Sequence, residues 1–313
     1  MRVAVGSRTF SRHPQLRSEL LALYPDTIFN DQGLSLKGDE LVEFLSNRDA
    51  AIIALEPMTE KVFSALPELK VIGKFGVGFD KLDLAAMTRC GVRLGWTGGV
   101  NKRSVTELAV TMMISLLRNV DISGREIREG QWKLRPGREL SFQTVGIIGC
   151  GHIGKDLAII LRALGCKVLV NDIIDFADFY KEHGLIPVSL DELLEQADVV
   201  TLHVPLNQDT RYMICAESLA RMKETAILIN TARGGLVDEV ALKERLKSGK
   251  LFAAAFDVFE IEPPQDMELL NLHNFMVTTH MGGSAAEAIL AMGRAAIKGI
   301  AENRLPEIGV FPL

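Results

Sequence analysis

The stretch from Val145 to Asp172 constrains the fold of this chain more than any other part of the sequence. An apolar run rich in β-branched residues ends at glycines with the spacing Gly149-x-Gly151-x-x-Gly154, and a helical pattern of apolar residues follows. A second apolar run ends at Asp172, 18 residues after Gly154. A strand, a glycine turn, a helix, a strand and an acid in this order predict a βαβ unit that binds a dinucleotide.

Each glycine in this unit has its own physical reason. Gly149 allows the tight turn, Gly151 lets the backbone approach a pyrophosphate, and Gly154 lets the helix pack closely on the strand. The helix that begins near His152 and Ile153 offers free N–H groups and the positive end of its dipole to the phosphates. The alternative is a glycine turn without a ligand, and the strand and acid in register make it the weaker one.

The acid at the end of the second strand indicates which dinucleotide is bound. Asp172 would accept hydrogen bonds from the adenosine ribose hydroxyls. A carboxylate repels the 2′-phosphate of NADP, and no Arg or Lys follows within residues 173–176 to bind that phosphate. We therefore expect NAD as the cofactor. We expect Cys150, inside the turn, to serve as a small residue and not as a nucleophile.

Composition and charge narrow the classes of protein further. A chain of 313 residues with 48% hydrophobic and 24% charged residues is long enough for two globular domains. The net charge of −5 argues against nucleic acid as a partner, and no apolar run is long enough to span a membrane. The first residues resemble a strand and not a signal peptide, and the four cysteines lack metal-ligand spacing. We expect a cytoplasmic protein without a metal site.

Up to about Trp96, short apolar runs alternate with amphipathic ones, which predicts a parallel α/β sheet. The predicted strands are Val3–Val5, Thr27–Phe29, Ala51–Leu55, Val71–Lys74 and Val92–Leu94. The predicted helices follow Pro14 or lie around Glu40–Leu45, Glu60–Leu66 and Leu84–Cys90. The glycine-rich segment Gly73–Asp80 follows a strand at the carboxyl edge, where open α/β sheets bind ligands. Its glycines either free N–H groups for a small anion or only shape a turn.

A glycine-rich joint at residues 97–101 separates this part from the rest of the chain. The apolar stripe that follows predicts one long helix over Ser104–Val120. Beyond the dinucleotide unit, the predicted strands are Val199–His203, Ala226–Asn230, Phe252–Phe256 and Asn274–Thr279. The predicted helices are Leu190–Glu195, Ser218–Met222, Glu239–Ser248 and Ala285–Asn303.

Three late segments each place a chemically capable residue beside a strand end. Arg233 follows a buried strand in a glycine-rich turn, where its guanidinium could bind a carboxylate bidentately. Glu262 lies in the acidic segment Asp257–Pro264, and His280 follows the last predicted strand. Beside a nicotinamide, Arg233 would anchor an α-keto acid, His280 would exchange a proton, and Glu262 would fix the imidazole tautomer. Singly, each has a structural alternative, namely a capping charge, a solvated acid or a core histidine.

With these motifs the sequence resembles the D-isomer-specific 2-hydroxyacid dehydrogenases over nearly the whole chain. The motifs that carry the resemblance are Gly76–Asp80, Ser104–Glu107, Gly149–Gly154, His203–Leu206, Asn230–Glu239, Asp257–Pro263 and His280–Ser284. The family implies two Rossmann-like or flavodoxin-like α/β domains with parallel sheets. An NAD-binding domain of residues 99–281 is inserted in a substrate domain of residues 1–98 and 282–313. It also implies a small 2-keto or 2-hydroxy acid as substrate and a homodimer built on the long helix after the first joint.

The resemblance assigns roles to particular residues. Arg233, Glu262 and His280 match the catalytic trio of the family. Beyond the glycine turn, the implied cofactor contacts are Thr106, Val204, Pro205, Thr231, Ala232, Asp257 and Gly283. The resemblance also implies that backbone amides near Val77 and Gly78 hold the substrate carboxylate, and we add Gly76 of the same motif and Lys74 at the strand end as substrate contacts. Lys74 would add a second positive charge, and a solvated lysine is the alternative.

The substrate itself is left open by the sequence. Relatives that act on phosphoglycerate tend to carry arginine in the loop after the strand at 51–55, where this chain has Glu56. The run Gly-Gly-Ser-x-x-Glu-Ala at residues 282–288 nevertheless resembles the phosphoglycerate branch most. Phosphoglycerate dehydrogenase and hydroxypyruvate or glyoxylate reductase are therefore both retained. Thr279, Met281 and Lys81 depart from the proline, isoleucine and asparagine usual in the family, which affects loop shape more than chemistry.

A different class of function is also consistent with the trio. Co-repressor members of the family sense NADH and bind partner proteins while keeping the same three residues. They have longer polar terminal extensions, whereas this chain starts on a predicted strand and stops shortly after a helix, so the enzyme is favoured. The formate-oxidising branch has glutamine where Glu262 stands and is disfavoured, and a phosphonate-oxidising activity stays open.

Overall fold

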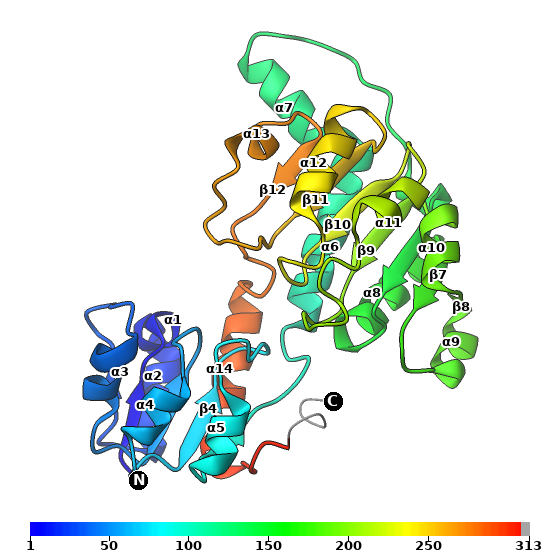
Figure 1. Cartoon of the computed structure of the whole chain (residues 1–313). Coiled ribbons are helices and arrows are strands. Elements are labelled where there is room, and N and C mark those ends of the chain that lie inside the picture. Colours follow the sequence, from blue (N-terminus) through cyan, green and yellow to red (C-terminus); the bar gives the residue numbers. More distant parts are fainter. Residues whose placement is uncertain (308–313) are drawn as a thin grey trace. The chain divides into compact units, whose positions relative to one another are not determined.

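The computed structural model of the chain describes residues 1–307, which form two compact units (Figure 1). The first unit consists of residues 1–101 and the segment from Ser284 onward, and residues 102–283 form a unit inserted between them. Each unit is built on a parallel sheet, with five strands in the first and seven in the inserted unit. The predicted fold class, two parallel α/β domains with one inserted in the other, is confirmed.

The sheet of the first unit has the order β2-β1-β3-β4-β5, with all strands parallel. Its strands are β1 (Val3–Val5), β2 (Ile28–Phe29), β3 (Ala50–Ile53), β4 (Val71–Lys74) and β5 (Arg93–Gly95). The three central strands are fully buried, because helices cover both faces of the sheet and leave no side for water.

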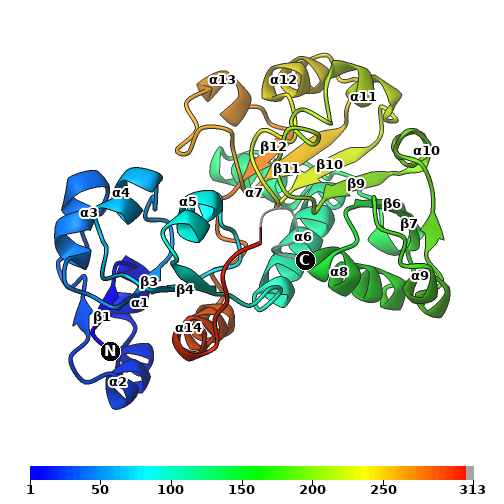
Figure 2. The same cartoon turned by 60° about the horizontal axis from the view of Figure 1, so that its bottom comes forward.

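Six helices surround this sheet within the described residues. They are α1 (Arg8–Arg12), α2 (Pro14–Leu23), α3 (Gly38–Leu45), α4 (Glu60–Ser64), α5 (Leu84–Arg89) and α14 (Ala286–Ala301). Helices α3, α4 and α5 pack on one face, and α2 and α14 pack on the other (Figure 2). Helix α14 approaches the sheet through glycines: a Cβ at Gly73 would lie 2.5 Å from the Ala296 carbonyl oxygen, and one at Gly95 would lie 2.0 Å from that of Gly299. The last helix of the chain is therefore an integral layer of the first unit.

The inserted unit has the strand order β12-β11-β10-β9-β6-β7-β8, again all parallel. Its strands are β6 (Thr144–Ile148), β7 (Lys167–Asn171), β8 (Ile186–Pro187), β9 (Val199–Leu202), β10 (Ile227–Asn230), β11 (Ala253–Phe256) and β12 (Phe275–Val277). The order reverses between β6 and β9, and such a switch point leaves a crevice at the carboxyl ends of the strands.

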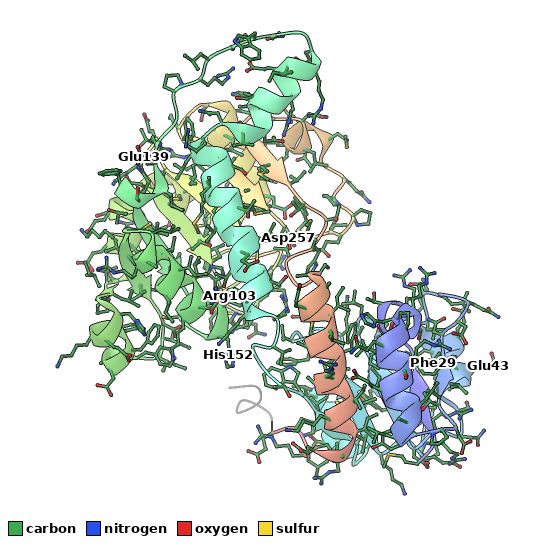
Figure 3. The ribbon with its side chains drawn as sticks, turned by 180° about the vertical axis from the view of Figure 1, so that it is seen from behind. Phe29, Glu43, Arg103, Glu139, His152 and Asp257 are labelled. Carbon is green, nitrogen blue, oxygen red and sulfur yellow. The ribbon has the colours of Figure 1, made fainter. Side chains whose placement is uncertain are left out.

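Two layers of helices cover the sheet of the inserted unit. Its helices are α6 (Lys102–Leu117), α7 (Val120–Arg128), η1 (Leu140–Phe142), α8 (His152–Ala163), α9 (Ala177–His183), α10 (Leu190–Gln196), α11 (Ala216–Arg221), α12 (Glu239–Lys247) and α13 (Met267–Leu270). Buried side chains of α6 and α8 pack on one face, and those of α10, α11 and α12 pack on the other. An ion pair of 2.8 Å between Arg103 of α6 (labelled in Figure 3) and Asp156 of α8 joins these two helices.

The long helix predicted over Ser104–Val120 is present as α6, but its predicted end is wrong. The first helix ends at Leu117, and Asn119 has a φ of 57°, which is a left-handed conformation that stops a helix. A second helix then begins at Val120. Asparagine tolerates this conformation, and the apolar stripe alone gave no sign of the break. The short elements α9 and β8 were not predicted either.

Two further observations concern the whole described chain. No helix within residues 1–307 is long and apolar enough to cross a membrane. All four cysteines are free thiols.

Candidate active site

The glycine turn after β6 has the geometry that a dinucleotide site requires. Gly149 has a φ of +96°, and a Cβ at this position would lie 2.7 Å from the carbonyl carbon of His203. A Cβ at Gly154 would lie 2.0 Å from the Gly149 carbonyl oxygen, so any side chain there would push α8 away from the turn. A Cβ at Gly151 would meet no atom within 4 Å. The turn is thus closed on its inner side and open at Gly151, where a pyrophosphate must approach.

The helix that follows the turn presents its N-terminus at the open side. Helix α8 begins at His152 (labelled in Figure 3). The His152 side chain is exposed, and that of Ile153 is half-buried. The first N–H groups of a helix have no partner inside it, so they are available to phosphate oxygens.

Asp172 has a structural task that the sequence did not reveal. One carboxylate oxygen accepts a hydrogen bond of 2.6 Å from the backbone N–H of Cys150, and the other accepts one of 2.9 Å from that of Ile174. The acid therefore holds the glycine turn against the end of β7. The Cys150 thiol is fully buried, and burial raises its pKa to about 11. A protonated, buried thiol is a poor nucleophile, in agreement with its predicted role as a small residue.

Three polar atoms on the other side of the switch point lack partners within residues 1–307. They are the hydroxyls of Thr106 and Thr231 and the Nδ1 atom of His203. Thr106 is fully buried on α6, and Thr231 follows β10. Burial lowers the pKa of His203 to about 3, so its imidazole is neutral. Buried polar groups without partners are rare in proteins, and these groups fit a polar ligand such as a nicotinamide carboxamide and ribose.

The remaining predicted cofactor residues lie along the same strand ends. Val204 and Pro205 directly follow His203 after β9, and Ala232 follows Thr231 after β10. Gly283 is the last residue of the inserted unit. Within the described residues, no group of three or more His, Cys, Asp or Glu side chains is arranged to hold a metal ion.

Asp257, at the end of β11 (Figure 3), is fully buried and anchors the segment that carries His280. Its carboxylate accepts hydrogen bonds from the Thr278 hydroxyl (2.5 Å) and from the backbone N–H groups of Met281 and Gly282 (2.8 Å each). Its backbone carbonyl accepts a further bond of 2.8 Å from His280 N–H. The resemblance to the family implied only that Asp257 lies beside the cofactor. The structure shows that it also fixes the histidine segment.

His280 and Glu262 form a hydrogen-bonded pair. The imidazole Nδ1 lies 2.9 and 3.1 Å from the two carboxylate oxygens of Glu262, and both side chains are partly exposed. Because Nδ1 is engaged by the carboxylate, proton exchange with a substrate falls to Nε2. His280 has a φ of 54°, which is unfavourable for a residue with a side chain and is maintained by the bonds to Asp257.

Arg233 lies on the loop next to the one that carries Glu262. It lies three residues after the end of β10, and its Nη1 donates a 2.7 Å bond to the Ala232 carbonyl. The Asn230 amide fixes this turn, donating 2.9 Å to the Arg233 carbonyl and accepting 3.1 Å from Ala232 N–H. A Cβ at Gly234 would lie 2.0 Å from the Phe259 carbonyl group, so the two loops touch through backbone atoms. The inserted unit thus brings the arginine loop, the glutamate loop and the histidine together.

The predicted substrate residues lie in the first unit, at the carboxyl end of β4 and in the loop after it. Lys74 is buried, with 3% exposure, and its ammonium donates to the carbonyls of Ala54 (2.7 Å) and Phe75 (3.1 Å), so the alternative of a solvated lysine is wrong. Gly76 has a φ of +111°. Within residues 1–307, the N–H groups of Val77 and Gly78 donate no hydrogen bond.

Glu56 lies at the same strand ends as Lys74. It is nearly buried, and its carboxylate accepts a 2.7 Å bond from the Ala54 N–H, while Lys74 binds the carbonyl of that same residue. The acid thus folds back onto the end of β3. Its negative charge lies at the strand end where the resemblance led us to expect an arginine in a chain that acts on phosphoglycerate.

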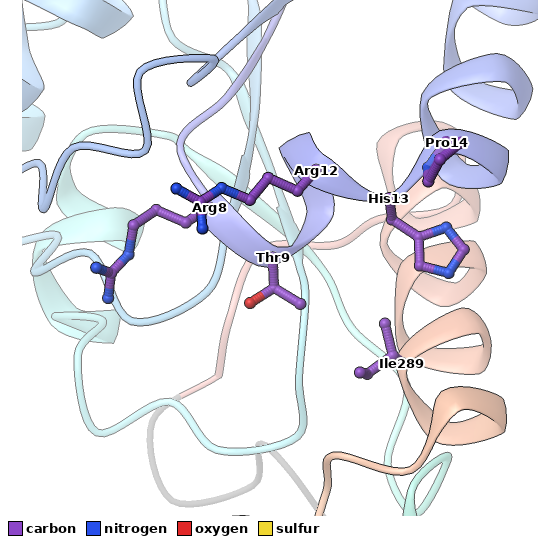
Figure 4. A pocket seen from close by; sticks show the side chains of 6 residues that line it. All are labelled: Arg8, Thr9, Arg12, His13, Pro14 and Ile289. Atoms are coloured by element: carbon purple, nitrogen blue, oxygen red, sulfur yellow. The ribbon is translucent and has the colours of Figure 1, made fainter.

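The first unit also has a pocket after β1 that sequence analysis missed (Figure 4). Its lining residues are Arg8, Thr9, Arg12, His13, Pro14 and Ile289. The two arginine side chains extend to one side, away from His13 and Ile289. His13 accepts a 3.3 Å bond from Leu16 N–H and so caps α2. The sequence did not indicate this pocket, because isolated basic residues on a short helix, such as Arg8 and Arg12, form no recognisable pattern.

A dinucleotide turn at a switch point, beside a histidine–glutamate pair and an arginine, defines an NAD-linked oxidoreductase. The sequence model of the D-isomer specific 2-hydroxyacid dehydrogenases, NAD binding domain, matches residues 110–282. The chain therefore belongs to this family, and NAD is its cofactor, as the sequence predicted.

The chain is similar in sequence or in structure to several named dehydrogenases and reductases. A hydroxypyruvate reductase of Thermotoga maritima is 38% identical, over 82% of this chain and 85% of its own length. A D-3-phosphoglycerate dehydrogenase of Methanocaldococcus jannaschii is 39% identical, over 82% of this chain but 50% of its own length. Among solved structures, D-lactate dehydrogenase from Aquifex aeolicus complexed with NAD and lactic acid has a TM-score of 0.84 at 27% identity, covering 96% of this chain and 94% of that one. This chain thus spans about half of the phosphoglycerate dehydrogenase and most of the other two.

Proposed function

We propose that this protein reduces short, unphosphorylated 2-keto acids to D-2-hydroxy acids and catalyses the reverse oxidation. The observation that carries the proposal is the His280–Glu262 pair, held beside the Arg233 loop in the unit that binds NAD. The bound nicotinamide supplies or accepts the hydride. The inserted unit would bind the cofactor, and the first unit, with predicted boundaries at residues 98 and 282, would bind the substrate.

Each catalytic residue has a distinct task in this proposal. Arg233 binds the substrate carboxylate and polarises the neighbouring carbonyl group. His280 donates a proton from Nε2 to the carbonyl oxygen during reduction and takes it back during oxidation. Glu262 accepts a hydrogen bond from Nδ1–H, which fixes the tautomer and balances the charge of the imidazolium. In the first unit, the proposed substrate-binding groups are the backbone N–H groups of Val77 and Gly78, together with Lys74 and Gly76.

The cofactor would be held by both sides of the crevice at the switch point. The backbone of Gly149, Gly151 and Gly154 and the start of α8 at His152 and Ile153 bind the pyrophosphate. Asp172 binds the adenosine ribose. The residues that would line the nicotinamide half are Thr106, Val204, Pro205, Thr231, Ala232, Asp257 and Gly283.

Glu56 favours a substrate without a second anion. A carboxylate at the end of β3 repels a phosphate bound within a few Å of it, and this repulsion costs several kcal/mol where water is excluded. Similar chains named hydroxypyruvate reductase and glyoxylate reductase match over most of their length, which supports the same choice. We therefore propose hydroxypyruvate and glyoxylate as substrates.

Steady-state NADH oxidation against glyoxylate, pyruvate, hydroxypyruvate and phosphohydroxypyruvate tests the substrate. We expect kcat/KM for hydroxypyruvate or glyoxylate to exceed that for phosphohydroxypyruvate by about 100-fold or more. Glu56→Arg should lower the ratio of these two kcat/KM values at least tenfold. Glu56→Gln, which removes the negative charge without adding a positive one, should lower the ratio less.

Two outcomes would contradict the proposal. A preference for the phosphorylated acid would direct attention to Arg8 and Arg12 of the pocket in Figure 4 as phosphate ligands. Feeble rates with every acid, together with tight NADH binding, would favour the NADH-sensing function.

Asp172→Asn should relax the preference for NAD. Asparagine keeps a side-chain oxygen that can accept the hydrogen bond from Cys150 N–H, so the glycine turn is retained while the charge is lost. We expect the ratio of kcat/KM with NADPH to that with NADH to rise about tenfold. An unchanged ratio would show that Asp172 does not select the cofactor.

We also propose that the protein is a homodimer located in the cytoplasm. Apolar side chains on α7 and the connector after it are exposed, namely Val120 (56%), Ile127 (56%), Trp132 (89%) and Leu134 (94%). Such a group is typical of a surface that a second subunit covers. Four free thiols without a disulfide are typical of a reducing compartment.

A further inference from the structure

Arg211, Tyr212 and Glu260 form a polar cluster, here called the clasp, two residues from Glu262. The Glu260 carboxylate accepts hydrogen bonds from Arg211 (2.5 Å) and from the Tyr212 hydroxyl (2.8 and 2.9 Å). The Arg211 guanidinium also lies 4.4 Å from the centre of the Tyr212 ring. These contacts lower the pKa of Glu260, first through Tyr212 and then through Arg211, so the carboxylate is ionised at neutral pH.

The clasp is tied to the loop that carries Arg233. Tyr212 N–H donates a 2.8 Å bond to the Gly235 carbonyl, and Ile214 N–H donates one of 3.1 Å to Leu236. Tyr212 has a φ of 51°, an unfavourable conformation that the two bonds of its backbone and side chain maintain. The strained residue therefore joins the arginine loop to the glutamate loop.

The glutamate loop is fixed from its other side as well. Glu239, the first residue of α12, accepts a 2.9 Å bond from the Glu260 backbone N–H. Phe259 N–H donates a 3.2 Å bond to Oε1 of Glu262, which is the carboxylate that also contacts His280. The side chain of Glu260 and the backbone around it thus set the position from which Glu262 reaches the imidazole.

We propose that Arg211, Tyr212 and Glu260 are positioning residues. They act on catalysis by holding Glu262 in the correct position relative to His280 and Arg233. The proposal rests on the proposed function, because it acts through the catalytic pair. None of the three side chains needs to touch substrate or cofactor for this role.

The exposure of the clasp separates positioning from stability. The side chains of Arg211 and Glu260 are 48% and 36% exposed, and exposed ion pairs add little to folding stability. Loss of the clasp should therefore leave the protein folded, while a displacement of catalytic groups by a fraction of an ångström lowers the rate strongly.

Glu260→Gln tests the proposal, with Tyr212→Phe as a second variant. The matched control is Glu195→Gln, which removes an exposed ion pair with Arg221 in the same unit (3.1 Å, side chains 56% and 46% exposed). We expect Glu260→Gln to lower kcat about tenfold and Tyr212→Phe to lower it about threefold, with NADH affinity and Tm within the range of the control. A kcat equal to that of the control in both variants would overturn the proposal.

A double-mutant cycle with Glu262→Gln shows whether the clasp acts through that residue. If it does, Glu260→Gln lowers kcat in the native background but has little further effect when Glu262 is already glutamine. Equal losses in both backgrounds would mean a general structural role and would overturn the inference. Normal turnover of the single variant Glu262→Gln would instead overturn the proposed function, so the two failures are distinguishable.

Discussion

His280→Gln should lower kcat about 100- to 10,000-fold, the range by which general acid–base catalysis accelerates such reactions. Glutamine can still contact Glu262 through its amide, but it has no imidazole to exchange a proton with the substrate. Because His280 exchanges a proton and does not bind the cofactor, the affinity for NADH should change little. Stopped-flow reduction of hydroxypyruvate and a fluorescence titration with NADH measure the two quantities.

The matched control for this variant is His273→Gln. His273 is an exposed histidine just before β12 in the same unit, and its replacement should leave kcat within twofold of the native value.

Arg233→Ala should lower kcat to a similar extent as His280→Gln, again with little change in NADH affinity. Turnover of the His280 variant within a few-fold of the native value would remove this residue from the mechanism.

Gly234→Ala is expected to have the second large effect. The added methyl group would lie 2.0 Å from the Phe259 carbonyl carbon and oxygen and 2.3 Å from the Glu260 nitrogen, so the two loops must separate. We expect a loss of about 1–3 kcal/mol in the free energy of unfolding, as for other overpacked sites. Because the separation moves Arg233 relative to Glu262, kcat/KM should fall about 100-fold.

Gly124→Ala is the control for this variant. Gly124 lies within α7, where a Cβ meets only the end of the Arg128 side chain at 3.8 Å. Alanine is a better helix former than glycine, so this variant should be as stable as the native protein or slightly more stable. Urea unfolding measures the free energy of unfolding of Gly234→Ala and of Gly124→Ala. Native activity with Ala at position 234 would show that the two loops tolerate separation.

The features that sequence analysis predicted correctly are local in the chain. The glycine turn and Asp172 lie within one βαβ unit, so their spacing alone indicated the fold and the cofactor. The alternation of apolar runs likewise predicted both parallel sheets, because buried strands and amphipathic helices have different periods. The assignment of Arg233, Glu262 and His280 as the catalytic trio stays a prediction, and the structure adds that the carboxylate of Glu262 lies within hydrogen-bond distance of His280.

The features that sequence analysis missed depend on contacts between distant residues. The bonds from Asp257 to Met281 and from Tyr212 to Glu260 span 24 and 48 positions, and no local pattern marks either pair. The burial of Lys74 is likewise a property of the packed sheet, since a lysine at a strand end is usually solvated. The break at Asn119 depends on one backbone angle that many asparagines do not adopt.

The position of α14 has a consequence for the order in which the chain folds as it is synthesised. All residues of the inserted unit precede Ser284, so this unit is complete before the last helix has been made. Until α14 emerges, the faces of β4 and β5 around Gly73 and Gly95 lack their cover, and the apolar side chains there are open to water. We expect the NAD-binding unit to fold first on the ribosome, while the N-terminal sheet depends on chaperones until α14 has been made.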